Sequence, residues 1–405
     1  MASTSTSSPS AGEIHTAINR LINNLINIKD TTGKFLLHLE DGRVIDTKSW
    51  NGWEWTHGIG LYGIWKYYEI TGDASLLKII EDWFAARFAE GGTTKNINTM
   101  AVFLTLAYVY EKTGNMAYLP WLDAWGEWTM HELPRTKYGG MQHVTYVTDN
   151  HQQLWDDTLM MTVLPLAKIG KLLGREEYIT EAKRQFLIHI QYLFDTKTGL
   201  FFHGWAFNTG TDADDTSTTT ISVEGHNFAN AHWARGNSWI TIVVPEIIEL
   251  LDLSPSDPIR MHLTNTLEAQ CSALRRLQDS ATGYWHTLLD HPDSYVEASA
   301  TAGFAYGILK ALRKRYIGSS TASAATATTT TAASTITSKE YRLVAEKAVR
   351  AVLGAVDDQG ELQNTSFGTP MGDTLQFYKE IPITAMPYGQ AMAMMALGEY
   401  LRCFL

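Results

Sequence analysis

The chain has 405 residues, of which 45% are hydrophobic and 19% are charged, and its formal net charge is −11. This composition is that of a globular protein able to bury a large core, which excludes a wholly disordered chain. The acidic balance and the lack of a long run of Lys and Arg argue against nucleic acid and anionic membranes as partners.

The two cysteines, Cys271 and Cys403, have neither CxxC spacing nor the density of a disulfide scaffold. They indicate a reducing compartment and give no support to a metal or redox cofactor. The amino-terminal residues lack the apolar core of a signal peptide, and no apolar run reaches about 18 residues. We therefore expect a cytoplasmic protein with no membrane partner, no cofactor and no metal. Residues 1–13, rich in Ser and Thr, are expected to be disordered.

Helical periodicity dominates from Ile14 onward. At the break Thr71-Gly72-Asp73, Gly72 suits a left-handed helix end and Asp73 can cap the next helix. Similar breaks around Gly114 and Gly174 indicate repeated helical hairpins. Further helices are predicted over residues 239–251, 259–277, 298–313, 340–356 and 387–401.

Long and short linkers alternate between these helices. The long linkers, which carry Trp, His, Gly and Asp, are residues 43–60, 85–100, 133–157, 196–238, 278–297 and 357–387. This asymmetry predicts an all-α protein closed into an α/α barrel with one functional rim. The low-complexity residues 318–338 are interpreted as a disordered loop between two helices, so that residues 14–405 form a single domain.

Asp156 and Asp157 stand at the start of an apolar helical run, directly after Trp155. A purely structural interpretation is available, because Asp is a favoured N-cap and acids suit the positive end of a helix. Alternatively, one carboxylate caps while the other lies against the indole, where partial desolvation would raise its pKa and let it donate a proton. The DDxxD pattern of a magnesium site is not met, because Met160 and Met161 occupy the distal positions.

The densest clusters of His, Trp and Arg lie around His203 and between His232 and Trp239. Arg235 and Trp239 would share one helix face, offering a guanidinium for a carboxylate and an indole for a sugar ring. Each of these residues is also common in protein cores. HExxH, GxSxG and Walker A signatures are absent, and the GxGxxG match at residues 58–63 lacks the βαβ context of a dinucleotide site.

Seven motifs occur along the chain in a specific order. They are Trp55-Thr56-His57-Gly58-Ile59-Gly60-Leu61-Tyr62-Gly63, Lys95-Asn96-Ile97-Asn98-Thr99, Trp155-Asp156-Asp157-Thr158-Leu159, His203-Gly204-Trp205, Trp233-Ala234-Arg235-Gly236-Asn237, Tyr295 through Ala302, and Gly368-Thr369-Pro370 through Tyr388-Gly389-Gln390. This series resembles the unsaturated rhamnogalacturonyl hydrolases of glycoside hydrolase family 105, which are related to the unsaturated glucuronyl hydrolases of family 88. The resemblance covers roughly residues 15–403.

The resemblance implies an (α/α)6 barrel that removes a 4,5-unsaturated uronic acid from the non-reducing end of lyase-generated oligosaccharides. In such enzymes one carboxyl group protonates C4 of the double bond, and water then adds at C5. Asp157 matches the acid/base, and Arg235 is a candidate partner of the uronate carboxylate. The substrate-binding positions implied by the resemblance are Trp55, Asn98, His143, Trp155, His203, Arg235 and Trp239. Asn98 lies near a position where the glucuronyl branch has a second aspartate.

Three other functions fit parts of the sequence. A conventional two-carboxylate glycosidase would pair Asp157 with Glu297 or Asp373. A sugar epimerase on the same scaffold would use paired histidines such as His203 and His232. A non-catalytic oligosaccharide-binding protein would keep the tryptophans and need no tuned acid. The parent polymer and the oligomeric state are not indicated by the sequence.

Overall fold

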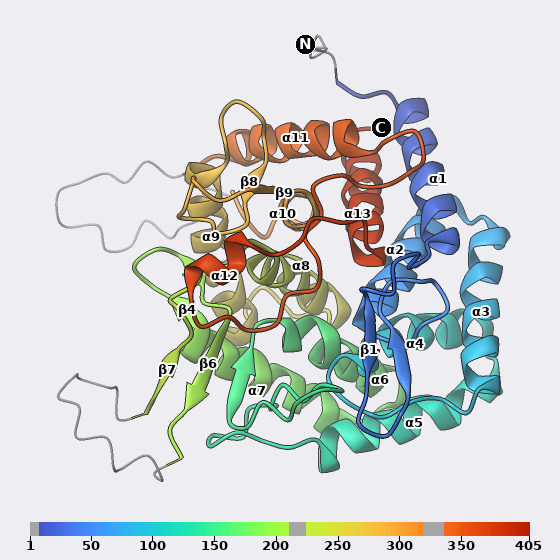
Figure 1. Ribbon diagram of the computed structural model, residues 1–405. Helices are drawn as coiled ribbons and strands as arrows, with labels where there is room; N and C mark the ends of the chain where they lie inside the picture. The colour runs from blue at the N-terminus through green and yellow to red at the C-terminus, as the bar shows by residue number, and fades with distance from the viewer. Residues whose placement is uncertain (1–7, 210–223, 319–335) are drawn as a thin grey trace.

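The computed structural model describes residues 8–209, 224–318 and 336–405, and most of this part of the chain is helical (Figure 1). The helices are α1 (Ala11–Asn27), α2 (Trp55–Thr71), α3 (Ala74–Ala89), α4 (Val102–Thr113), α5 (Leu119–Glu127), α6 (Leu164–Leu173), α7 (Glu176–Leu193), α8 (Ala234–Leu250), α9 (Pro258–Leu277), α10 (Ala298–Arg313), α11 (Ser338–Ala355), α12 (Leu375–Lys379) and α13 (Pro387–Phe404). The five late helices predicted from periodicity are α8 to α11 and α13, although α8 begins earlier than predicted, at Ala234.

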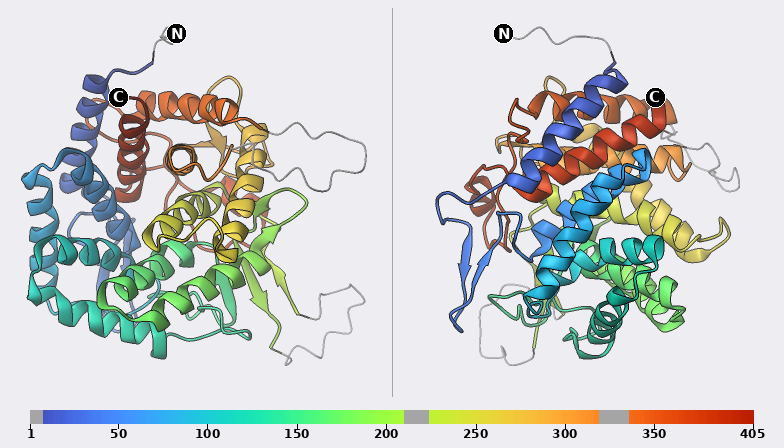
Figure 2. Two further views of the ribbon diagram at one scale, coloured as in Figure 1. Left: turned by 180° about the vertical axis from the view of Figure 1, so that it is seen from behind. Right: turned by 90° about the vertical axis from the view of Figure 1, so that its right-hand side faces the viewer.

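Six helices close a ring. Along the ring α2 packs against α4, α4 against α6, α6 against α8, α8 against α10 and α10 against α13, and α13 returns to α2. Outside it, α1 packs on α13, α3 on α2, α5 on α6, α7 on α6, α9 on α8 and α11 on α10 (Figure 2). This arrangement confirms the closed (α/α)6 barrel.

The two rings differ in how their helices are buried. Every residue of the inner helix α8 except Glu249 is buried, as expected for a helix surrounded by others. The outer helix α9 buries one stripe that includes Leu263, Leu267 and Leu274 and leaves its other face to solvent. The apolar pattern of each helix therefore decides the ring it occupies.

Short turns and long linkers lie at opposite ends of the barrel. Gly72, Gly114 and Gly174 end α2, α4 and α6 in the left-handed conformation, with φ of 66°, 65° and 67°, which confirms the predicted hairpin breaks. The long linkers carry the strands β1 (Leu36–His38), β2 (Val44–Asp46), β3 (Gln153–Trp155), β4 (Phe194–Asp195), β5 (Leu200–Phe201), β6 (Gly204–Phe207), β7 (Gly225–Asn227), β8 (Trp285–His286) and β9 (Val296–Glu297).

At the short-turn end, charged side chains from all six inner helices surround a cavity of about 370 Å³. Glu246 lies at its centre, with its carboxylate 2.7 Å from Lys310 Nζ and 3.6 Å from Lys66 Nζ. Helix carboxyl ends carry partial negative charge. The two lysines therefore stabilise both the Glu246 carboxylate and the carboxyl ends of the inner helices.

Two expectations about the chain's organisation need adjustment. Helix α1 begins at Ala11, where Ser10 and Glu13 form a capping box, so the ordered barrel starts before residue 14. Residues 319–335 lie outside the described residues, but their flanks are described. Ser338 already belongs to α11, and its Oγ donates to the Gly318 carbonyl oxygen at 2.7 Å. The segment therefore joins two helices, α10 and α11, that pack against each other.

None of the helices in the described ranges combines the length and the apolar character needed to cross a membrane.

Candidate active site

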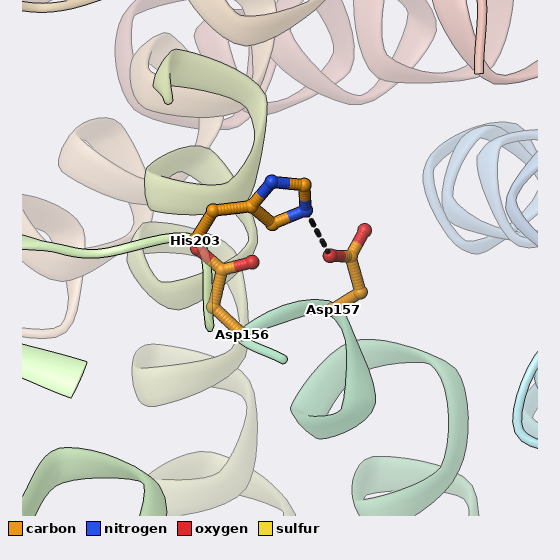
Figure 3. Close-up of side chains that lie close together, drawn as sticks. All are labelled: Asp156, Asp157 and His203. Atoms are coloured by element: carbon orange, nitrogen blue, oxygen red, sulfur yellow. Dashed lines mark ion pairs between the residues drawn. The ribbon is translucent and has the colours of Figure 1, made fainter. Parts of the chain in front are cut away.

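A three-stranded sheet, β3-β6-β7, brings the Asp pair next to His203. Strands β3 and β6 are antiparallel, with Trp155 opposite Gly204, and Asp156 N–H donates to the His203 carbonyl oxygen at 3.0 Å. A Cβ on Gly204 would lie 2.9 Å from the Leu154 carbonyl oxygen, so a larger residue here would press on the backbone of β3. Backbone pairing thus places the Asp157 and His203 side chains face to face (Figure 3).

Asp157 has a hydrogen-bond donor on one carboxylate oxygen and the His203 ring beside the other. Trp239 Nε1 donates to Oδ1 at 3.1 Å, and His203 Nε2 lies 3.3 Å from Oδ2. Burial alone would raise the pKa of Asp157, but the neighbouring His203 outweighs it and lowers the pKa below the ordinary range. The expectation of a raised pKa for Asp157 is therefore wrong. It considered burial against the Trp155 indole but not the neighbouring Trp239 N–H and His203 ring. The Asp157 side chain is 13% exposed, so it is open to a ligand.

His203 is oriented by Tyr378, a residue of α12 that the motifs did not identify. Tyr378 Oη lies 2.7 Å from His203 Nδ1 and accepts a hydrogen bond from Gly372 N–H at 3.1 Å. Burial raises the pKa of Tyr378 and lowers that of His203, so both are neutral near pH 7. The phenol proton is then donated to Nδ1, which leaves the imidazole proton on Nε2, facing Asp157.

Asp156 is completely buried, and neither of its carboxylate oxygens has a hydrogen-bond partner among the described residues. It does not cap the following helix with its side chain, so the capping interpretation is wrong for Asp156. Its carboxyl group packs instead against α8, where a Cβ on Gly236 would lie 2.2 Å from Oδ2. Burial, followed by the charge of Asp157, raises the pKa of Asp156 well above its usual range.

Trp155 and His143 lie behind Asp157. Their rings stack with centroids 4.2 Å apart and an interplanar angle of 8°, and both side chains are buried. His143 Nδ1 lies 2.9 Å from Thr158 Oγ1, and Trp155 Nε1 donates to Gln153 Oε1 at 2.9 Å. Trp155 and His143, both predicted as binding residues, are therefore buried side chains that pack beneath the site.

Trp239 of α8 contacts Asp157, Trp55 of α2 contacts Trp239, and Asn98 lies in the linker before α4. Trp55 is partly exposed; it meets Trp239 edge to face at 6.1 Å and stacks on Tyr388 at 4.5 Å. Asn98 is also partly exposed and hydrogen-bonds to the carboxyl group of Glu54, whose pKa burial raises to about 8. Tyr388 and Glu54 were not identified from the sequence as site residues.

Arg235 is completely buried, and its two terminal nitrogens are occupied by the loop before α12. Nη1 donates to Ser366 Oγ at 2.6 Å, and Nη2 donates to the Phe367 carbonyl oxygen and Thr369 Oγ1, both at 3.0 Å. The forked pair with a substrate carboxylate is therefore not available in this geometry, because both prongs bind protein. Only Nε lacks a partner among the described residues.

The residues of the alternative functions are engaged elsewhere. Glu297 caps α10 through Ala300 N–H at 2.5 Å and lies 3.8 Å from Arg235 Nη1. His232 lies 2.8 Å from Asp290 Oδ2 through Nδ1 and 3.7 Å from Asp195 Oδ2 through Nε2, so both of its ring nitrogens face other acids.

Within the described ranges, one group of acids and histidines is compact enough to share a cation: Asp156, Asp157 and His203, with ligand atoms within 4.8 Å of one another.

Comparisons with known proteins identify the relatives of this chain. The sequence model of Glycosyl Hydrolase Family 88 matches residues 27–332 and 319–404. Unsaturated rhamnogalacturonyl hydrolase YesR from Bacillus subtilis is 29% identical over 353 residues, covering 86% of this chain and 90% of that protein. The structure of a possible member of the GH105 family from Salmonella enterica superimposes with a TM-score of 0.88 and 58% identity, covering 98% of this chain and 96% of the other. An unsaturated glucuronyl hydrolase from Streptococcus agalactiae shares the fold, with a TM-score of 0.69 at 16% identity, covering 98% and 93%.

Proposed function

Because the chain belongs to glycosyl hydrolase family 88, we propose that it is an unsaturated rhamnogalacturonyl hydrolase. In this proposal the enzyme removes a 4,5-unsaturated uronic acid from the non-reducing end of an oligosaccharide left by a polysaccharide lyase. The similarity to YesR over most of both chains supports this substrate class.

The setting of Asp157 is the observation that carries the proposal. It is a partly exposed carboxylate with the Trp239 indole N–H donating to one oxygen and the His203 ring 3.3 Å from the other. Such a group can hold a proton and also be stabilised as a carboxylate once the proton has left. A conventional glycosidase needs a second acid across the sugar, and Glu297 is bound to α10 and the Ser366 loop instead.

The chemistry follows from one group acting twice. Asp157 donates its proton to C4 of the C4=C5 double bond, and the positive charge that forms at C5 is shared with the ring oxygen. Water adds to C5 and gives a proton back to Asp157. The resulting hemiketal opens by breaking the bond between C5 and the ring oxygen, which makes C5 a ketone and leaves C1 as a hemiacetal. Collapse of this hemiacetal to the aldehyde releases the leaving sugar without attack at the glycosidic carbon.

The neighbouring side chains supply the binding surface. The partly exposed indole of Trp55 gives a flat apolar surface for a sugar ring, and Asn98 offers an amide beside it. The buried guanidinium of Arg235 acts through the positive charge it places near Trp55, whose ring centre is 6.0 Å from Arg235 Cζ. This charge favours a substrate carboxylate near Trp55.

Two measurements test the proposal. A panel of lyase-generated oligosaccharides should lose the ultraviolet absorbance of the conjugated uronate when the enzyme is added. In heavy water, one deuterium should appear at C4 of the released uronate, whereas direct glycosidic hydrolysis would leave that carbon without deuterium.

Asp157→Asn should reduce turnover by about 10²–10⁴-fold, because an amide cannot deliver the proton, while substrate binding persists. Asp373→Asn is the matched control, because Asp373 is exposed on the loop before α12. Loss of turnover in both Asp157→Asn and Asp373→Asn would favour a two-carboxylate mechanism, and retention of turnover in Asp157→Asn would refute ours. The parent polymer and the cytoplasmic location stay predictions, to be checked by the same substrate panel and by cell fractionation.

A further inference from the structure

Asp156 is a buried acid that the hydration mechanism does not use. Its side chain has no exposed surface, and no described group donates to either of its oxygens. An ionised carboxylate without donors in such a place is strongly destabilised, since burial of an unpaired charge costs several kcal/mol or more. The physical consequence is that Asp156 carries a proton at neutral pH.

The proton on Asp156 affects the charge of Asp157, because the two carboxyl groups lie close together. One carboxylate oxygen from each residue and one ring nitrogen of His203 lie within 4.8 Å of one another. Two carboxyl groups at this separation titrate as a pair rather than singly. Asp157 accepts from the Trp239 indole N–H and lies 3.3 Å from His203 Nε2, whereas Asp156 has no donor among the described residues, so the negative charge of the pair resides on Asp157 in the empty site.

We propose that Asp156 and Asp157 share one proton, which Asp156 keeps in the empty site and Asp157 carries when the unsaturated uronate is bound. The proposal rests on the proposed function. The substrate's carboxylate brings a second negative charge beside Asp157 and makes its ionised form less favourable. The proton then moves from the buried carboxyl to the exposed one, where C4 can receive it.

The proton balance closes in each turnover. Asp157 gives the proton to C4 and recovers one from the attacking water, and when the product leaves, the proton returns to Asp156. Asp156 does not touch the substrate and is a positioning residue that determines where the proton is held. The other titratable or charged groups that face the pair are His143, His203, Arg235 and Tyr378.

Packing fixes the distance between the two carboxyl groups. The Asp156 carboxyl lies against the first turn of α8, where a Cβ on Gly236 would come within 2.2 Å of Oδ2 and 2.6 Å of Oδ1. The backbone of α8 at Gly236 blocks one side of the Asp156 carboxyl group, and Asp157 follows it directly in the chain. The Asp156 side chain therefore cannot rotate to a position exposed to solvent.

The pH dependence of kcat/KM tests the proposal with Asp156→Asn. The amide has the shape of a protonated carboxyl, so we expect the melting temperature at pH 7 to change little. Asp157 would then titrate alone, and the alkaline limb of kcat/KM should move to lower pH, with about tenfold loss of activity at pH 7 for each unit of displacement. Activity should recover on acidification, with KM at the acid plateau unchanged. A profile that superimposes on the wild-type profile, or a uniform loss at every pH, would overturn the proposal.

Two further measurements keep the test decisive. In the wild-type enzyme, infrared difference spectra should show a change in a protonated carboxyl band when a saturated uronate binds, and no change would overturn the proposal. Loss of all activity on chelation, restored by a divalent cation, would assign these atoms to a metal and likewise overturn it. The failure of the proposed function is distinguishable, because the wild-type enzyme would then leave the ultraviolet absorbance of the oligosaccharide panel unchanged at every pH.

Discussion

Tyr378→Phe removes a single hydroxyl group that controls the tautomer of His203. The hydroxyl lies 2.7 Å from Nδ1 and accepts from Gly372 N–H at 3.1 Å, so its loss leaves two buried polar groups without a partner. Each unsatisfied group costs about 1–3 kcal/mol, which predicts about 2–6 kcal/mol if neither finds water and less where one does.

The catalytic effect follows from the imidazole. Without the phenol donor, His203 can place its proton on Nδ1 and turn a lone pair toward the Asp157 carboxylate. That arrangement no longer stabilises the carboxylate, so the pKa of Asp157 should rise from its lowered value. If one donor interaction of about 1.4–2.8 kcal/mol is lost from the transition state, kcat/KM falls about 10–100-fold.

The assay is kcat/KM as a function of pH, measured together with the melting temperature. Tyr341→Phe is the matched control. Tyr341 lies on the outer helix α11, is also buried, and donates one hydrogen bond to Glu268 Oε1 at 2.7 Å. Both variants should lose stability, but only Tyr378→Phe should change the pH profile. Equal kinetics in the two variants would refute the argument that Tyr378 sets the tautomer.

Three further predictions concern other parts of the molecule. Arg235→Lys keeps the charge but cannot bind Ser366, Phe367 and Thr369 together, so the free energy of unfolding should fall by at least about 1.5 kcal/mol and kcat/KM should fall with it; unchanged urea denaturation and kinetics would contradict this. Glu246→Gln should lose about 1.5–3 kcal/mol at pH 7, because it removes a buried charge paired with Lys310. Lysines beside Glu246 hold its pKa below the ordinary range, so its charge contributes stability above an unfolded pKa of about 4.3 that is lost as pH falls. The stability difference between wild type and Glu246→Gln should therefore shrink below about pH 4, and a constant difference in denaturation experiments would count against the ion pair. Trp55→Ala should raise KM by about tenfold with a smaller change in kcat, because stacking contributes about 1 kcal/mol beyond burial; an unchanged KM would place the sugar elsewhere.

Much of the barrel could be predicted from local patterns. Gly72, Gly114 and Gly174 marked helix ends because only a residue that accepts positive φ can end a helix in this way. The alternation of short turns and long linkers indicated a closed ring with one functional rim, since each hairpin leaves its loops at alternate ends.

The site was predicted less completely than the fold. His203 and Trp239 were identified, but not that they face opposite oxygens of Asp157. Tyr378 was missed because it stands 175 residues from His203 and belongs to no local pattern. The only indication in the sequence that Tyr378 belongs to the site was its position in the long linker 357–387.

By itself the sequence determined the helices, their order around the ring and the residue types gathered at one rim, because these follow from hydrophobic period, capping and turn chemistry along the chain. Which acid is charged was decided by the tertiary structure alone. Asp156 and Asp157 are chemically identical neighbours, and they differ because His203 and the indole N–H of Trp239 face Asp157, whereas α8 presents a bare glycine backbone to Asp156. A pKa depends on charges, donors and solvent within a few ångströms, and the groups that supply or withhold them here lie tens of residues away in the chain, brought close by packing.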